Sequence, residues 1–215
     1  MPSKLRRCTP ETSLVGNQEV QMETKSCLVV TLVTSEGNID IELYDKYAPV
    51  ACKNFAQLAE RGRYDGSVFH RVIKGFIVQG GFLGENADIC NTFGHFFDDE
   101  ISRLTHCGAG IVSSASAGPN LNGTEFFITL SPQPKLDGKY TVFGRVRSGM
   151  TVVERIASTI VDENYRPVVP CRVRQCHVQW MPLLRRPWVN SIDEDDTPCP
   201  KKRRRERPLL SRLQD

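Results

Sequence analysis

Apolar and polar residues alternate along most of the middle of the chain, and this pattern predicts a protein built mainly from short β-strands. Val, Leu and Thr prevail in 28–34, and apolar and acidic residues alternate strictly in 39–43. Turn residues at 35–38 separate the two runs, which predicts a β-hairpin with one buried face. Six further runs have strand character: 68–73, 76–79, 110–114, 125–130, 141–146 and 172–180.

Two segments have the spacing of helices. In 48–61, Pro49 suits a first helical turn, Gly62 follows as a stop, and apolar side chains recur at Ala51, Phe55 and Leu58. A shorter apolar stripe in 151–158 predicts a second helix. Because the strands do not alternate regularly with helices, the pattern favours an antiparallel barrel over a parallel sheet. The predicted fold class is therefore mainly β, with an eight-stranded antiparallel closed barrel.

The two ends of the chain lack this periodicity. Residues 1–26 are polar and predict a flexible N-terminal arm, whereas 27–181 form the predicted domain. In 182–215 prolines recur among charged residues, which predicts a disordered charged tail. This tail carries nine Lys and Arg and six Asp and Glu, which leaves 19 of each kind elsewhere. A neutral domain gives no reason to expect a nucleic-acid-binding face outside the tail.

The basic run 201–207 in this tail has two interpretations. It is typical of a nuclear import signal or a weak nucleic-acid contact, and equally of a solvated disordered segment. The chain has no apolar stretch of membrane-spanning length and no signal-peptide core, so we expect no membrane association and an intracellular location, in the nucleus, the cytoplasm or both. The eight cysteines are scattered, which predicts reduced thiols and no metal site.

The motifs of several enzyme classes are absent from the sequence. There is no phosphate-binding Gly-rich loop, no His-Glu-x-x-His helix and no Gly-x-Ser-x-Gly elbow, so no cofactor is expected. Two segments look too specialised for packing alone. The first, 69–81, places Arg71 and Gln79 at an even spacing that points both to one face of a sheet if Gly75 keeps the register. The second, 113–128, has small residues ahead of Phe126 and Phe127, which lets another backbone approach closely.

Both segments resemble the two signature stretches of cyclophilins, and the resemblance extends from about Val29 to Trp180. It includes the segments 37–44, 52–59, 97–100 and 136–146, in the order in which the family has them. The chain is most similar to the small cyclophilin-like isomerases associated with the spliceosome. The resemblance implies peptidyl-prolyl cis–trans isomerase activity in protein folding or assembly, and a barrel with a helix capping each end. Such a reaction needs no metal or cofactor. The sequence gives no reason to expect a dimer, so we expect a monomer. The implied partners are proline-containing peptides or proteins, and spliceosomal proteins among them.

The resemblance also implies a proline pocket on the outer wall of the barrel. The catalytic group that it assigns consists of Arg71, Phe76, Gln79 and Phe127. The substrate-binding group consists of Ile77, Ala115, Ser116, Ala117, Glu125, Leu136 and Tyr140. Rotation about an X-Pro bond breaks amide resonance and frees a lone pair on the prolyl nitrogen, to which a guanidinium can donate. Arg71 is the expected donor, although an isolated strand arginine is usually a solvated or ion-paired residue.

The sequence departs from the family at three places. The loop 82–91 lacks the usual acidic and glycine-rich pattern, and Lys135 replaces the tryptophan of cyclosporin-sensitive members, which predicts weak cyclosporin binding. Glu125 stands where glutamine is common; it either pairs with Arg71 or selects basic substrates. These departures keep an alternative open, in which the domain is a low-activity proline-peptide-binding scaffold in a nuclear ribonucleoprotein complex. In a third interpretation the basic tail is the functional part and the barrel carries it.

Overall fold

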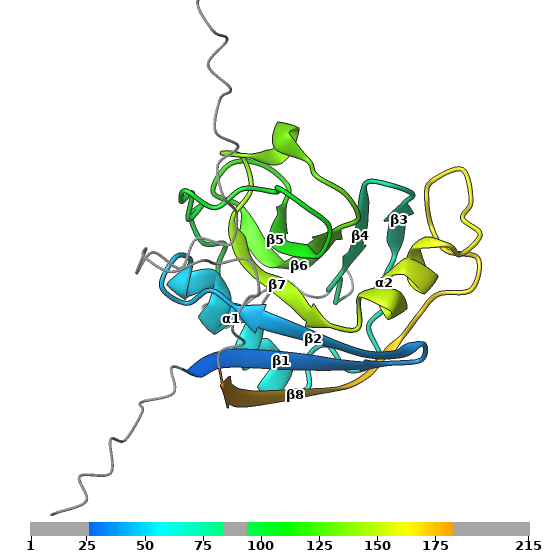
Figure 1. Ribbon diagram of the computed structural model, residues 1–215, viewed down its shortest axis with the longest axis horizontal. Coiled ribbons are helices and arrows are strands. Elements are labelled where there is room, and N and C mark those ends of the chain that lie inside the picture. The colour runs from blue at the N-terminus through cyan, green and yellow to red at the C-terminus, as the bar shows by residue number, and fades with distance from the viewer. Residues whose placement is uncertain (1–25, 84–93, 183–215) are drawn as a thin grey trace, which may run out of the picture.

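One antiparallel sheet of eight strands forms most of the computed structural model, which describes residues 26–83 and 94–182 (Figure 1). The predicted arm and charged tail lie outside the described residues, apart from their innermost positions. In chain order the strands are β1 (Ser26–Thr34), β2 (Gly37–Leu43), β3 (Arg71–Ile73), β4 (Ile77–Gly80), β5 (Ile111–Ser116), β6 (Asn122–Thr129), β7 (Val142–Ser148) and β8 (Val173–Pro182). All eight predicted strands are present.

The strands are hydrogen-bonded in the order β3-β4-β6-β5-β7-β2-β1-β8, so β3 and β8 are the two ends of the ladder. The segments leading into these two strands meet at an isolated bridge between Val68 and Arg172. The N–H of Phe69 donates to the carbonyl of Cys171 at 3.1 Å beside this bridge. Within the described residues no continuous ladder joins β3 to β8, and the closed barrel of the sequence prediction is therefore not confirmed.

Two helices cover opposite ends of the curled sheet (Figure 1). Helix α1 (Pro49–Glu60) packs against β6, β7 and β8, and α2 (Met150–Ala157) packs against β2, β3 and β4. Pro49 lies at the start of α1, where its missing N–H removes no helical hydrogen bond. The buried faces carry the apolar residues that define the predicted stripes, among them Phe55 and Leu58 in α1 and Val153 in α2. Neither helix in the described part is long and apolar enough to cross a membrane.

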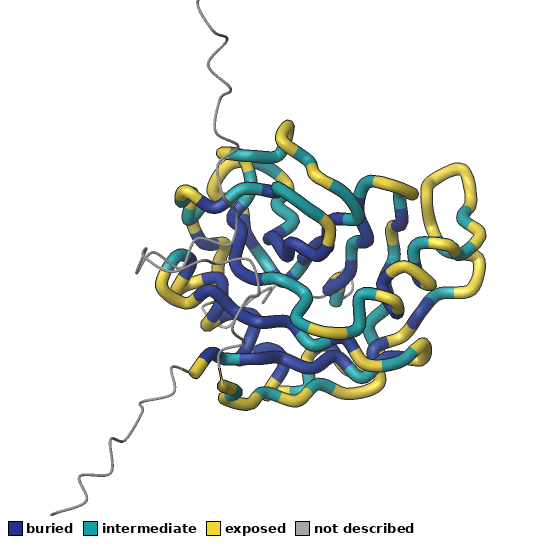
Figure 2. Tube along the Cα trace, in the orientation of Figure 1, coloured by how far each residue is buried: buried dark blue, intermediate teal, exposed yellow. Residues whose placement is uncertain are grey.

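The core lies between the inner face of the sheet and the two helices (Figure 2). Phe126 of β6 is its aromatic centre, because its ring contacts the rings of Phe55, Tyr64 and Phe69 at centroid distances of 5.2, 5.9 and 6.2 Å. Burial of these four aromatic rings removes a large apolar area from water and so stabilises the domain.

The first and last described strands lie side by side. Ser26 at the start of β1 is directly opposite Pro182 at the end of β8, and the two strands remain paired along their whole length. Cys27, Cys52, Cys171 and Cys176 are free thiols, as predicted for the cysteines in general, whereas Cys107 is disulfide-bonded and departs from that prediction.

Candidate active site

Three predicted site residues lie in one row across three strands. Arg71 of β3 is directly opposite Gln79 of β4, and Gln79 is directly opposite Phe127 of β6. The row continues to Ser113 of β5, the partner of Phe127. Directly opposed residues of an antiparallel pair project from the same face of the sheet. We call Arg71, Gln79, Phe127 and Ser113 the outer row.

The neighbours of these residues show which face the row occupies. Val72 and Val78, which alternate with Arg71 and Gln79, have no exposed surface, and Phe126 belongs to the core. The outer row therefore projects away from the core. Since adjacent strands are about 4.8 Å apart, the backbone of Arg71 is roughly 10 Å from that of Phe127, which a long arginine side chain can span.

The guanidinium of Arg71 is available to a ligand. Arg71 is exposed, and its side chain makes no hydrogen bond or ion pair within the described ranges. Its five N–H donors are therefore open to hydrogen bonds from outside the described part of the domain. The backbone of Arg71 is nevertheless held by its neighbour, because Val72 donates its N–H to the carbonyl of Tyr165 at 2.9 Å. The segment that contains Tyr165 thus covers this edge of β3.

Glu125 contacts Gln79 and His70. The amide of Gln79 donates to Glu125 Oε2 at 2.7 Å, and His70 Nε2 lies 3.4 Å from the same oxygen. No ion pair joins Glu125 to Arg71, so this option of the sequence prediction is wrong. Burial alone would raise the pKa of Glu125, but hydrogen bonds from His70 and Gln79 and the attraction of His70 lower it below its usual value. The carboxylate is therefore charged at neutral pH.

Within the outer row, Phe127 forms the apolar floor of the site. It is 3% exposed, its ring lies edge-on to Tyr140 at 5.5 Å, and it stacks on His106 at 5.9 Å. Ile77 lies diagonally next to Phe127 on the same face, since Ile77 is opposite Thr129. Ile77 and Tyr140 thus lie next to Phe127, and this apolar group adjoins Gln79, the direct strand partner of Phe127.

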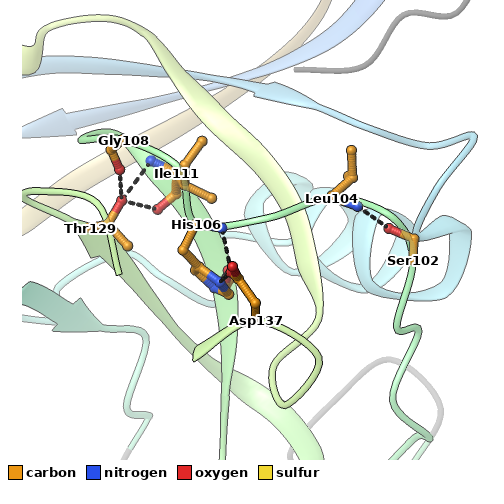
Figure 3. Close-up of polar contacts among 8 residues, drawn as sticks. Ser102, Leu104, His106, Gly108, Ile111, Thr129 and Asp137 are labelled. Carbon is orange, nitrogen blue, oxygen red and sulfur yellow. Dashed lines mark hydrogen bonds and ion pairs between the residues drawn. The ribbon is translucent and has the colours of Figure 1, made fainter. Parts of the chain in front are cut away.

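His106 lies behind this floor, fully buried, and both of its ring nitrogens are hydrogen-bonded. Nδ1 lies 2.9 Å from Asp137 Oδ1, and Nε2 lies 2.9 Å from Ser113 Oγ. The His106 backbone N–H also donates to Asp137 at 2.7 Å (Figure 3). Burial lowers the pKa of His106 although its hydrogen bond and attraction to Asp137 oppose this. In the neutral ring Nδ1–H donates to the carboxylate, so Nε2 accepts from the Ser113 hydroxyl.

The turn that follows His106 is also fixed to the sheet. The hydroxyl of Thr129 donates to the carbonyl of Gly108 at 2.8 Å and accepts from the N–H of Ile111 at 3.0 Å (Figure 3). Sequence reasoning missed His106 because its segment has no strand or helix period. An isolated histidine gave no sign that it would meet Asp137, which lies 31 positions further along the chain.

The outer row forms one wall of the site. The second wall is the segment 130–140, which includes the short 3-10 helix η1 (Pro134–Leu136). Leu136 and Tyr140 are half-buried there. The N–H of Gln133 donates to the carbonyl of His106 at 2.7 Å, and its side chain donates to the carbonyl of Gly75 at 3.2 Å. Leu130 donates to the carbonyl of Phe76 at 2.8 Å. This wall is therefore bound both to the β3–β4 turn, which carries Phe76, and to the layer behind Phe127.

Ala115 and Ser116 are the last two residues of β5, and Ala117 follows them. The pairing of β5 with β6 is irregular between Ser114 and Ser116, and exposure increases toward Ala117. Small side chains at this edge leave the backbone accessible to an approaching peptide. The structure thus brings Arg71, Gln79, Glu125, Phe127, Ile77 and Tyr140 together, with Phe76, Leu136 and 115–117 at the margins; the individual roles of these residues stay predictions.

Comparison with known proteins identifies the family. Residues 29–178 match the family described as cyclophilin type peptidyl-prolyl cis-trans isomerase/CLD. An Arabidopsis thaliana peptidyl-prolyl cis-trans isomerase is 49% identical over 151 residues, which cover 69% of this chain and 92% of the relative. A Neurospora crassa protein named peptidyl-prolyl cis-trans isomerase-like 1 is 48% identical over 151 residues, covering 69% of this chain and 93% of the relative.

A solved structure agrees with the sequence comparisons. A cyclophilin type peptidyl-prolyl cis-trans isomerase of Cryptosporidium parvum, crystallised in the presence of the dipeptide Ala-Pro, matches with a TM-score of 0.67 and 36% identity. The match covers 70% of this chain and 98% of that one. With the family match spanning most of the described residues and relatives near half identity, this chain belongs to the cyclophilin-type peptidyl-prolyl cis–trans isomerase family.

Proposed function

We propose that this cyclophilin-type isomerase turns X-Pro bonds by means of the outer row, with Arg71 as its catalytic cation. The observation that carries the proposal is the register that places Arg71, Gln79 and Phe127 directly opposite one another. A long cationic side chain, a polar amide and a buried aromatic ring are thereby presented side by side on one face.

The chemistry asks for no covalent step. The barrier to rotation about the bond is about 20 kcal/mol because the twisted amide loses its resonance, whereas the two end states differ by only about 1 kcal/mol. When the prolyl nitrogen becomes pyramidal it regains a lone pair, to which the Arg71 guanidinium donates. The planar ground state cannot accept this hydrogen bond, so the interaction stabilises the transition state selectively.

The apolar surface around Phe127 supplies the anchor for the ring. Phe127 and Ile77 present side chains that are already mostly buried, so their positions are set before a ligand arrives. A pyrrolidine held against Phe127 stays fixed while the preceding carbonyl turns. Gln79 lies between Arg71 and Phe127 and is held in place by Glu125, which suits it to contact the peptide backbone. The Cryptosporidium parvum relative crystallised with Ala-Pro supports a proline-containing peptide as the ligand.

The isomerisation rate of a proline-containing peptide tests the proposal. Arg71→Ala should lower kcat/KM by about 100-fold or more, the usual loss when one transition-state donor is removed. Arg174→Ala is the matched control, because Arg174 is an exposed strand arginine, on β8, that does not belong to the outer row. Equal rates for Arg71→Ala and the native protein would refute the catalytic role.

We further propose membership of the spliceosome-associated subgroup, an intracellular location in the nucleus or cytoplasm, and a closed barrel. The relatives named peptidyl-prolyl cis-trans isomerase-like 1 support the subgroup, and the Val68–Arg172 bridge supports closure.

A fluorescent fusion lacking 199–215 tests nuclear import: loss of nuclear accumulation supports it, and unchanged accumulation contradicts it.

A proline-peptide-binding scaffold is the second candidate function. Glu125 and the exposed Lys135 favour it, because both place charges where the family commonly has neutral groups. Peptide binding without measurable turnover, together with loss of partner capture on Phe127→Ala substitution, would support this function over catalysis.

A further inference from the structure

The carboxylate of Glu125 lies beside the outer row, two residues before Phe127 on β6. Its side chain is 30% exposed, so part of the group faces the solvent on the substrate side of the sheet. The donors that fix it, Gln79 and His70, both reach Oε2. Gln79 is also the direct strand partner of Arg71, so Glu125 lies next to the outer row.

Within the described residues this negative charge has no Lys or Arg partner, and its only ion-pair contact is with His70. The amide of Gln79 donates a hydrogen bond to the Glu125 carboxylate but, being uncharged, does not neutralise its negative charge. Half-buried charges are screened by salt less than fully exposed ones. The carboxylate therefore imposes a negative potential on any peptide that lies across Gln79 and Phe127.

The distance along β6 indicates where a substrate charge would meet this potential. Two residues of a strand span about 6.7 Å, which is the length of about two residues of an extended peptide. A peptide whose proline rests on Phe127 thus brings Glu125 within reach of side chains one to three residues away from that proline. Lys and Arg have the positive charge and the length that such a contact requires.

We propose that Glu125 forms a subsite for a Lys or Arg side chain placed one to three residues from the isomerised proline, so that the favoured substrates are basic peptides. This inference rests on the proposed use of the outer row for X-Pro peptides. The simpler explanation is that Glu125 only orients Gln79. Glu125→Gln separates the two, because glutamine keeps an oxygen that can accept from Gln79 but removes the charge.

The experiment uses a neutral proline-containing peptide in which Lys, Gln or Glu is placed in turn at each of the three positions on either side of proline. The kcat/KM for isomerisation is measured for the full chain, for Glu125→Gln, and for Glu154→Gln. Glu154→Gln is a matched control, since it makes the same change of net charge at an exposed position of α2. The affinity of each peptide is measured by calorimetry in parallel.

At one or more positions, we expect kcat/KM for the Lys peptide to exceed that for the Glu peptide by about three- to fivefold. This ratio should hold in the native chain and in Glu154→Gln, in keeping with the strength of partly exposed ion pairs. The ratio should fall to about one in Glu125→Gln, and should shrink in the native chain as salt is raised. A native ratio of one at every position, or a ratio that survives in Glu125→Gln, would overturn the inference.

The parallel affinities keep the two proposals distinguishable. If no peptide is turned over, the isomerase proposal fails, but a Lys-over-Glu preference in binding that Glu125→Gln abolishes would still establish the subsite. If all peptides are turned over with no charge preference in rate or affinity, the subsite fails and the isomerase proposal stands.

Discussion

The imidazole of His106 lies almost parallel to the ring of Phe127, with centroids 5.9 Å apart and an angle of 18° between the planes. Because the same imidazole contacts Ser113 on β5 and Asp137 after η1, one buried side chain joins the floor of the site to its second wall. Asp137 directly follows Leu136, so the position of that wall depends on a group that no ligand touches.

His106→Leu should therefore weaken both stability and substrate binding. Leucine leaves the buried Ser113 hydroxyl without its partner and removes the imidazole contact of Asp137, which keeps only the hydrogen bond from the backbone N–H of residue 106. An unsatisfied buried polar group costs about 1–3 kcal/mol. Urea denaturation should show a loss of about that size, and KM should rise because Leu136 is held less firmly. His106→Gln, which retains one hydrogen bond, should recover part of both. An unchanged KM in a folded His106→Leu protein would contradict a positioning role.

The stability of the protein should decrease in mild acid through His106. Since the pKa of His106 in the folded state lies below the ordinary value of 6.5, the unfolded chain binds the proton more readily. The contribution is fully present above pH 6.5 and is lost as the pH falls through the lower folded pKa. Urea denaturation of the native chain and of His106→Gln should be compared between pH 8 and pH 5, about 1.5 pH units on either side of the ordinary histidine pKa. The loss of unfolding free energy over this range should be smaller in the variant. Parallel losses would rule His106 out as the source.

Adjacent phenylalanines on β6 should have opposite roles. Phe126 packs against three core rings, so Phe126→Ala should cost about 3–5 kcal/mol of stability. Phe127 faces outward against His106 and Tyr140, so Phe127→Ala should cost less stability and lower kcat/KM at least about tenfold. Thermal denaturation and the isomerase assay on the folded fraction distinguish the two. Equal loss of activity per folded molecule would argue against the assignment of faces.

Most of the fold was predictable, because alternation and helical stripes are local properties of the sequence. The predicted helix 48–61 differs from Pro49–Glu60 by one residue at each end. The predicted strand 68–73 was too long, since only Arg71–Ile73 pairs with β4 and Val68 instead bridges to Arg172. Such long-range pairing has no local signal.

The candidate site was predictable only in part. Even spacing from Arg71 to Gln79 correctly indicated a shared face, because the β3–β4 turn keeps the register through Gly75. The partner of Glu125 was not predictable, since the choice among Arg71, His70 and Gln79 depends on side-chain conformation. The contribution of His106 depends on contacts between three separate segments and came only with the structure.

Lys135 should limit the affinity for cyclosporin. It is exposed on η1 beside Leu136, in the position that the resemblance assigns to a tryptophan in cyclosporin-sensitive proteins. Lys135→Trp should tighten cyclosporin binding at least about tenfold, because a large aromatic surface replaces a hydrated ammonium group. Fluorescence titration measures the change, with Lys139→Trp as a control for added aromatic surface nearby. Tight binding by the native chain would contradict the prediction.

Because Ser26 pairs directly with Pro182, the distance between these two positions can report whether the folded sheet is intact. Two dyes attached at these positions would sit about one strand spacing apart, where energy transfer between them is almost complete. Separation of β8 from β1 would move the dyes apart and lower the efficiency of energy transfer. Because β8 approaches β3 near Arg172 and the ten residues Val173–Pro182 extend about 30 Å beyond that point, such reporters would lie far from Arg71.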